Sequence, residues 1–228
     1  MITELVERRR VTVAIAIALL VVAIDQFVKI WVKTHFFYGE AMPLIGDADK
    51  PFLLQLLFIE NNGFAFGMEA FSKPLLSVFR IVASVLFVVY MLRMARAKVP
   101  IGYLITVAMV TAGTIGNTID GVCYGVLFDD PQAYGVTARF LPPEGGYAPL
   151  LAGKVVDMIG VEWDWANWLP WVGGSRFRFA IFNVADAALS VGVAVLILFY
   201  SKYLSTPIKP EAQEAPSETP DDTQQPQP

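Results

Sequence analysis

Four long apolar segments constrain the fold of this chain more than any other feature of its sequence. They cover about residues 11–32, 75–92, 99–119 and 179–200. An α-helix needs about 20 predominantly apolar residues to cross the hydrocarbon core of a bilayer. Only 17% of the residues are charged, whereas a soluble domain carries about a quarter. We therefore predict an α-helical membrane protein in which residues 1–205 form a four-helix unit.

Basic residues that flank the apolar segments predict the orientation of the chain. Lys and Arg in short loops stay on the cytoplasmic side of a membrane, and here they gather at one set of helix ends: Arg8, Arg9, Arg10, Arg93, Arg96, Lys98, Lys202 and Lys209. We expect both termini in the cytoplasm of a bacterium, with residues 33–73 and 121–178 outside its inner membrane. Residues 206–228 are rich in Pro, Glu, Asp and Gln, so we expect a disordered acidic tail.

The first outer segment carries a strand pattern. Phe52–Ile59 is apolar with loose alternation, and the following Glu60–Gly63 has turn chemistry. We expect a small extracytoplasmic β-sheet that lies on the membrane.

Composition argues against several classes of protein. With one cysteine, Cys123, and one histidine, His35, the chain cannot supply a thiolate metal cluster or an internal disulfide framework. The acidic residues of the tail account for much of the negative net charge, and no basic surface or nucleotide motif is apparent. We expect no metal, no cofactor and no nucleic-acid partner.

Two acidic residues lie in apolar surroundings where a charge is costly. Asp157 lies within Val155–Ile159, and Asp186 is the only formal charge in Phe179–Tyr200. An ionisable residue within a membrane segment is a functional candidate by default. If the two carboxylates meet, both cannot stay ionised, so one pKa rises and the pair shares a proton, as in aspartic proteases. Such a pair activates water for peptide hydrolysis.

Further polar residues reach the same outer ends of the helices. Asp25 is near the end of the first helix, Asn117 and Asp120 close the third, and Asn183 opens the fourth. On this placement Asp186 lies about 10 Å into the last helix at 1.5 Å per residue. A site can form at this leaflet.

Several of these residues also have a purely structural interpretation. Asp25 and Lys29 are spaced i,i+4 and can neutralise each other. Asn117 and Asn183 can be interhelical hydrogen-bonding residues. Arg80, within the second apolar segment, is expected to reach the outer lipid headgroups along its own stem.

Five blocks of the sequence resemble the bacterial lipoprotein signal peptidases, also called signal peptidase II. In order, they are Asp25-Gln-x-x-Lys29, Asn61-x-Gly-x-Ala-Phe66, Gly113-x-x-Gly-Asn-x-x-Asp120, Val156-Asp157 and Phe182-Asn-x-Ala-Asp186. The resemblance implies a four-helix membrane aspartic endopeptidase that removes the signal peptide of diacylglyceryl-modified prolipoproteins, cleaving before the lipidated cysteine. It also implies a small outer sheet that cradles the substrate and an outer loop or helix that acts as a lid.

The resemblance assigns roles to individual residues. The catalytic pair falls on Asp157 and Asp186. Residues that line or support the site are Asn61, Asn117, Asp120 and Asn183, and structural or supporting residues are Asp25, Lys29 and Gly63. The implied partners are lipid-modified prolipoproteins and membrane lipids.

Two departures from the family pattern concern the outer side. Many members have Arg directly after the aspartate that is Asp120 here, but this chain has Gly121. Arg139, Arg176 and Arg178 are candidates to replace that side chain. The segment 125–154 is longer than in a compact member, which indicates an inserted loop.

Two other functions compete with proteolysis. Asp25, Asp120 and Asp186 can form a proton relay in a small ion- or proton-coupled transporter, although the four segments show no inverted repeat. A non-catalytic membrane scaffold with structural polar contacts is the third possibility.

Overall fold

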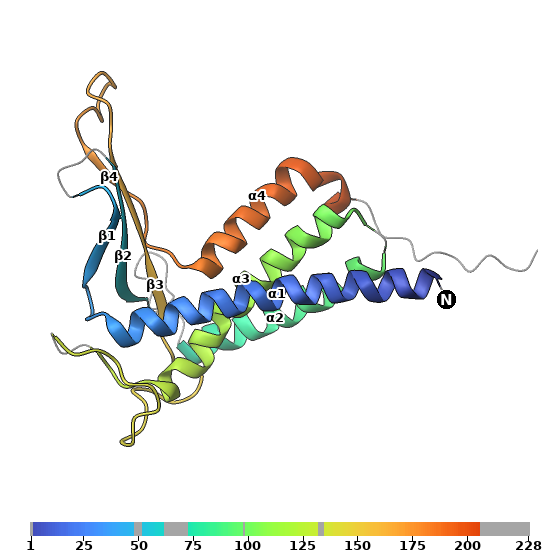
Figure 1. Cartoon of the computed structure of the whole chain (residues 1–228), viewed down its shortest axis with the longest axis horizontal. Helices are drawn as coiled ribbons and strands as arrows, with labels where there is room; N and C mark the ends of the chain where they lie inside the picture. The colour runs from blue at the N-terminus through green and yellow to red at the C-terminus, as the bar shows by residue number, and fades with distance from the viewer. Residues whose placement is uncertain (1, 48–51, 62–72, 98, 132–134, 206–228) are drawn as a thin grey trace, which may run out of the picture.

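The computed structural model describes residues 2–47, 52–61, 73–97, 99–131 and 135–205 (Figure 1). Gly63 and the predicted tail, 206–228, therefore lie outside the described residues. So do residues 64–72, which belong to the first predicted outer segment.

Four helices are long and apolar enough to cross a membrane, which confirms the predicted number. They are α1 (Ile2–His35), α2 (Lys73–Arg96), α3 (Ile101–Leu127) and α4 (Val184–Ser205). In α3 the apolar window is 61% buried, against 17–22% in the other helices, so α3 is the central helix of the bundle.

The third helix continues well past the apolar segment that predicted it. Its last turns are covered by the loop that follows. The loop donates backbone hydrogen bonds from Leu151 to the carbonyl of Val122 (3.0 Å) and from Gly153 to that of Gly121 (2.9 Å). Asp120 is therefore inside α3, not at its end as expected.

The fourth helix begins later than expected, at Val184. Asn183 stands directly before the helix, and its side-chain oxygen accepts the backbone N–H of Asp186 at 2.9 Å, an N-capping arrangement. The capping bond places Asp186 in the first turn. The prediction that Asp186 lies about 10 Å into the helix is therefore wrong.

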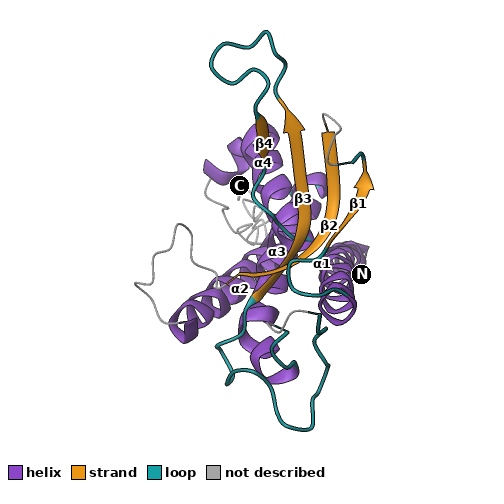
Figure 2. Cartoon of the chain, turned by 90° about the vertical axis from the view of Figure 1, so that its left-hand side faces the viewer, coloured by secondary structure: helices purple, strands orange, loops and turns teal. Residues whose placement is uncertain are grey.

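The sheet is antiparallel with the strand order β1-β2-β3-β4 (Figure 2). Its strands are β1 (Ala41–Ile45), β2 (Phe52–Asn61), β3 (Val155–Asp164) and β4 (Arg176–Arg178). The predicted strand is thus confirmed as the core of β2, and β3 supplies its partner from the second outer segment. The sheet stands at one end of the bundle, opposite the N-terminus (Figure 1).

An apolar cluster joins the sheet to the helices. Phe58 and Met158 from the sheet are fully buried with Val32 of α1 and Tyr124 of α3. This cluster fixes the height of β2 and β3 over the outer helix ends.

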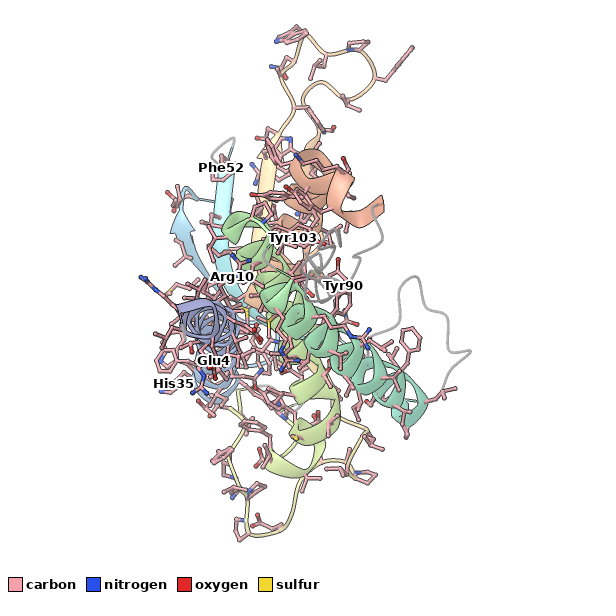
Figure 3. All side chains as sticks on the ribbon, turned by 90° about the vertical axis from the view of Figure 1, so that its right-hand side faces the viewer. Glu4, Arg10, His35, Phe52, Tyr90 and Tyr103 are labelled. Atoms are coloured by element: carbon pink, nitrogen blue, oxygen red, sulfur yellow. The ribbon has the colours of Figure 1, made fainter. Side chains whose placement is uncertain are left out.

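At the other end of the bundle, polar contacts tie the helices together. Arg10 of α1 donates to the carbonyls of Ala95 (3.1 Å) and Val99, around the connection between α2 and α3. Tyr90 of α2 and Tyr103 of α3 share a hydroxyl hydrogen bond (Figure 3).

The connections on the sheet side are loops and turns among the described residues. Beyond the end of α3, residues 128–131 and 135–154 form no helix, and neither do residues 165–175. The predicted inserted loop thus runs from Phe128, because residues 125–127 belong to α3.

Candidate active site

Asp157 and Asp186 are brought together where β3 meets the start of α4. Asp157 lies in β3, and Asp186 lies in the first turn of α4. A β-bridge between Ile159 and Phe182 holds the chain before α4 against β3, with N–H···O distances of 2.8 and 3.1 Å. Asp157 is only 4% exposed, and within the sheet it is paired with Ile59 of β2.

Asn183 connects the two aspartates. Its side-chain nitrogen donates to Oδ1 of Asp157 at 2.8 Å, while its side-chain oxygen caps the N–H of Asp186. Its backbone N–H also faces Oδ2 of Asp186 at 3.4 Å. One fully buried amide therefore sets the position of both carboxylates.

Asn117 of α3 orients the Asp186 carboxylate. It donates from Nδ2 to Oδ1 of Asp186 at 2.6 Å. Its own oxygen accepts hydrogen bonds from Lys29 (2.9 Å) and Asn183 (3.1 Å). Because both of those groups are donors, the amide nitrogen of Asn117 is directed at Asp186.

Asp25 and Asp120 form a buried ion cluster around Lys29. The Lys29 nitrogen lies 2.9 Å from Asp25 and 2.8 Å from Asp120, and all three side chains are buried. The expected pair within α1 is therefore present, with an additional partner on α3. Asp120 also accepts the N–H of Val156 (3.2 Å), and Asp25 accepts that of Ala185 (2.8 Å). The cluster thus anchors the residue immediately before each candidate catalytic aspartate.

Gln26 supports this cluster, and its role could not be read from the sequence. It donates to Asp120 (3.0 Å) and to the carbonyl of Gly116 (3.2 Å), and it accepts the hydroxyl of Tyr124 (3.1 Å). These three partners are on α3, about 90 positions away, so local spacing carries no signal for the contacts; Gln26 also donates to the adjacent Asp25 at 3.1 Å.

Asn61, at the end of β2, donates to Oδ2 of Asp157 at 3.2 Å. Asp157 therefore accepts one amide on each oxygen. Burial, together with the nearby charge of Asp186, raises the pKa of Asp157 to about 6, although the bonds from Asn61 and Asn183 act in the opposite direction. The Asp157 carboxyl thus retains its proton to a higher pH than an exposed aspartate.

A second buried ion cluster lies beneath the sheet. Glu60 of β2 pairs with Lys33 of α1 and, at 3.1 Å, with Lys154. The Lys33 nitrogen lies 5.2 Å from the ring centre of Phe128 and 5.3 Å from that of Tyr147. Sequence reasoning missed this cluster because its members come from α1, β2 and the loop before β3.

The three arginines considered as substitutes at Gly121 are engaged elsewhere. Arg139 pairs with Asp129 and Glu144, Arg176 with Asp164, and Arg178 with Glu162. The guanidinium beside Gly121 belongs instead to Arg80 of α2. A Cβ built at Gly121 would lie 3.1 Å from its Nη1.

The donor set of the described residues offers no obvious metal centre. Within that part of the chain, no three or more His, Cys, Asp and Glu side chains are grouped so that they could hold a metal ion. Asp25 and Asp120, the buried acids nearest to the pair, are already bound to Lys29. A metal-free reaction stays a prediction.

A family model and two sequence relatives all match this chain to signal peptidase II, and a solved membrane enzyme structure shares its fold. A family model described as signal peptidase (SPase) II matches residues 17–202. Lipoprotein signal peptidases of Porphyromonas gingivalis are 36% identical over 199 residues, covering 85% of this chain and 84% of the relative. That of Amoebophilus asiaticus is 30% identical over 209 residues, with 87% and 82% covered. A solved bacterial membrane enzyme structure shares the fold, with a TM-score of 0.52, 22% identity, and 86% of this chain and 95% of that chain covered.

Four helices long and apolar enough to cross a membrane, with a small sheet at one end, are the architecture of a multi-pass membrane protein, and the comparisons make it a peptidase of the aspartic type. The chain belongs to the signal peptidase II family.

Proposed function

We propose that this protein removes signal peptides from diacylglyceryl-modified prolipoproteins, cutting before the lipidated cysteine, with Asp157 and Asp186 as its catalytic pair. The observation that carries this proposal is the bond network in which Asn183 and Asn117 hold the two carboxylates side by side. The relatives named above are lipoprotein signal peptidases, which supports the choice of substrate. The proposed catalytic unit is residues 1–205.

The chemistry follows from sharing one proton between two carboxylates. The ionised carboxylate takes a proton from a water molecule, whose oxygen attacks the scissile carbonyl carbon, while the protonated carboxyl donates its proton to the carbonyl oxygen. The tetrahedral intermediate then collapses as the C–N bond breaks and a carboxyl proton passes to the leaving amine. With its raised pKa, Asp157 is the member suited to hold the proton at the start.

Asn61, Asn117 and Asn183 support this step by holding the carboxylates. Asp25, Lys29 and Asp120 support it indirectly, because they anchor the backbone before each aspartate. In this proposal none of these six side chains transfers a proton.

The proposed location is the outer face of a bacterial inner membrane, with both termini in the cytoplasm. The sheet lies at the end of the bundle opposite the N-terminus (Figure 1), and the pair lies in β3 and in the first turn of α4. The basic residues Arg8, Arg93, Arg96 and Lys202 belong to the other end of the helices. The positive-inside rule then puts the pair outside. Family membership does not favour the transporter alternative.

The test uses the purified full chain in lipid, with a synthetic lipidated prolipoprotein peptide. The wild type is expected to cleave before the lipidated cysteine, to leave the unlipidated peptide intact, and to remain active in a chelator. Separate Asp157→Asn and Asp186→Asn variants should lose activity by several orders of magnitude. Asp164→Asn is a matched control, since Asp164 is also in β3 but pairs with Arg176 at the surface. Near wild-type cleavage by either variant of the pair would show the assignment to be wrong.

A further inference from the structure

Arg80 of α2 lies beside the candidate active site. Its Nη1 is close to the backbone of Gly121, where an added Cβ would come within 3.1 Å of both Nη1 and the Ser77 hydroxyl. A side chain at position 121 would compete with the guanidinium for this space. Glycine at this position therefore leaves room for the Arg80 head group.

The guanidinium is electrostatically coupled to the acidic groups of the site. Its charge interacts with Asp120, Asp186 and Asp157, in decreasing order. Asp120 is already bound to Lys29 at 2.8 Å, whereas within the described residues no ion pair joins Asp157 or Asp186 to a cation. Arg80 is therefore a second positive charge near the candidate pair, in addition to Lys29.

No hydrogen bond or ion pair engages the Arg80 side chain within the described residues. The only hydrogen bond of Arg80 outside the helix ladder is made by its carbonyl, which accepts the hydroxyl of Thr118 at 3.4 Å. The fork of N–H donors on a guanidinium matches paired oxygen acceptors. A cation within a membrane segment is costly unless it meets a partner. Open donors next to Gly121, the residue that follows Asp120, therefore point to an acceptor that arrives with the substrate.

We propose that Arg80 is a substrate-binding residue whose guanidinium donates to carbonyl oxygens of the peptide next to the scissile bond, in space left open by Gly121. This inference rests on the proposed peptidase function. α2 thereby contributes to a site whose other described residues come from α1, α3, α4 and the sheet. As the scissile carbonyl gains negative charge in the transition state, the same cation stabilises it.

The first part of the test compares Arg80→Gln with Arg80→Lys in the lipidated-peptide assay, using the full chain. Arg80→Gln should lower kcat/KM by about a hundredfold to a thousandfold, the range by which removal of one oxyanion donor lowers kcat. Arg80→Lys keeps the positive charge but not the planar set of guanidinium N–H donors. Its kcat/KM should therefore lie between those of Arg80→Gln and the wild type. Arg96→Gln is the matched control, because Arg96 lies on the same helix in an exposed pair with Glu7.

The second part tests the shared space by a double-mutant cycle. Gly121→Ala places a methyl group against Nη1 and should lower kcat/KM several-fold in the wild type. In the Arg80→Gln background the same change should have a smaller effect, because the contact with the guanidinium is gone and only that with the Ser77 hydroxyl remains. Thermal unfolding of each variant, expected to stay near that of the wild type, separates a binding role from a structural one.

The outcomes distinguish this proposal from the one on which it rests. If the wild type cleaves, Asp157→Asn does not, and Arg80→Gln cleaves like the wild type, the role of Arg80 is overturned and the peptidase function stands. Additive effects of Arg80→Gln and Gly121→Ala on kcat/KM in the double-mutant cycle also overturn the role of Arg80. If the wild type itself fails to cleave the lipidated peptide, the proposed function is what fails.

Discussion

The side-chain nitrogen of Asn183 lies 2.8 Å from Oδ1 of Asp157, and the oxygen of the same amide caps the helix that carries Asp186. The group that ends the loop and begins α4 is thus also the group that joins the candidate catalytic pair. Helix initiation and site assembly depend on one residue. Substitutions at this position can separate the two contributions.

Asn183→Ser should retain the cap but lose the bond to Asp157, because a hydroxyl is too short to reach both groups. We expect the free energy of unfolding to change little, since Ser is as good an N-cap as Asn, whereas Asn183→Ala should cost about 0.5–2 kcal/mol. Activity should fall in both variants, by about tenfold or more for one lost hydrogen bond to a charged group. Thermal unfolding and kcat/KM measured on both variants check this. Equal stability of the two variants would contradict the capping role.

Lys29 is the single cation between two buried acids on different helices. Lys29→Met should leave Asp25 and Asp120 without their cation, a loss that costs about 3–5 kcal/mol for buried pairs. Activity should fall as well, because Asn117 loses one of the two donors, Lys29 and Asn183, that direct its amide at Asp186. Arg8→Met is the control, since Arg8 pairs with Glu4 at the surface and such pairs contribute about 0–1 kcal/mol. Thermal unfolding in detergent measures both variants, and similar values for the two would refute the prediction.

The pKa of Asp157, raised to about 6, predicts how activity depends on pH. The reaction needs one proton on the pair, and that proton is lost as the pH rises through this pKa, so kcat/KM should fall on the alkaline side. Asn61→Leu removes a hydrogen bond that lowers the pKa. The alkaline limb of the pH profile should therefore move to higher pH in this variant. A limb that stays in place or moves to lower pH would contradict the assignment.

The same pKa fixes the sign of its linkage to stability. The Asp157 carboxyl binds its proton more tightly in the folded protein than in the unfolded chain, whose ordinary value is 3.8. Its contribution to stability is therefore fully present below about pH 3.8 and is lost as the pH rises through about 6. Asp157→Asn should remove this part of the pH dependence, which unfolding measured between pH 4 and 7 in the wild type and the variant can test.

Hydropathy and local spacing predicted the elements of this protein but not the contacts between them. The four helices, the strand around Phe52–Ile59 and the importance of Asp157 and Asp186 follow from apolar runs and from the cost of charges within them. The direction of Arg80 did not follow, because it depends on the space beside Gly121 on another helix. The start of α4 was misplaced because residues before Asn183 are apolar but bridge to β3 instead of forming a helical turn. Hydropathy alone does not distinguish these two outcomes.

Glu60 gives the last prediction, because it links α1, the sheet and the loop before β3 through Lys33 and Lys154. Glu60→Gln removes the buried anion between two cations, so the two ammonium groups repel each other and we expect a loss of about 3–5 kcal/mol in unfolding free energy. Asn61, the next residue of β2, contacts Asp157, so activity should fall below what stability alone explains.

Glu144→Gln is the control for this prediction, since Glu144 pairs with Arg139 in an exposed loop. Its effect on the free energy of unfolding should stay below about 1 kcal/mol.

A double variant, Lys33→Met with Glu60→Leu, removes one cation and the anion together. It should be more stable than Glu60→Gln alone, because replacing a buried ion pair by apolar groups of similar volume often leaves stability unchanged. If the double variant is the less stable of the two, Glu60 does not act through Lys33, and the sheet is held to α1 chiefly by the apolar cluster around Phe58 and Val32.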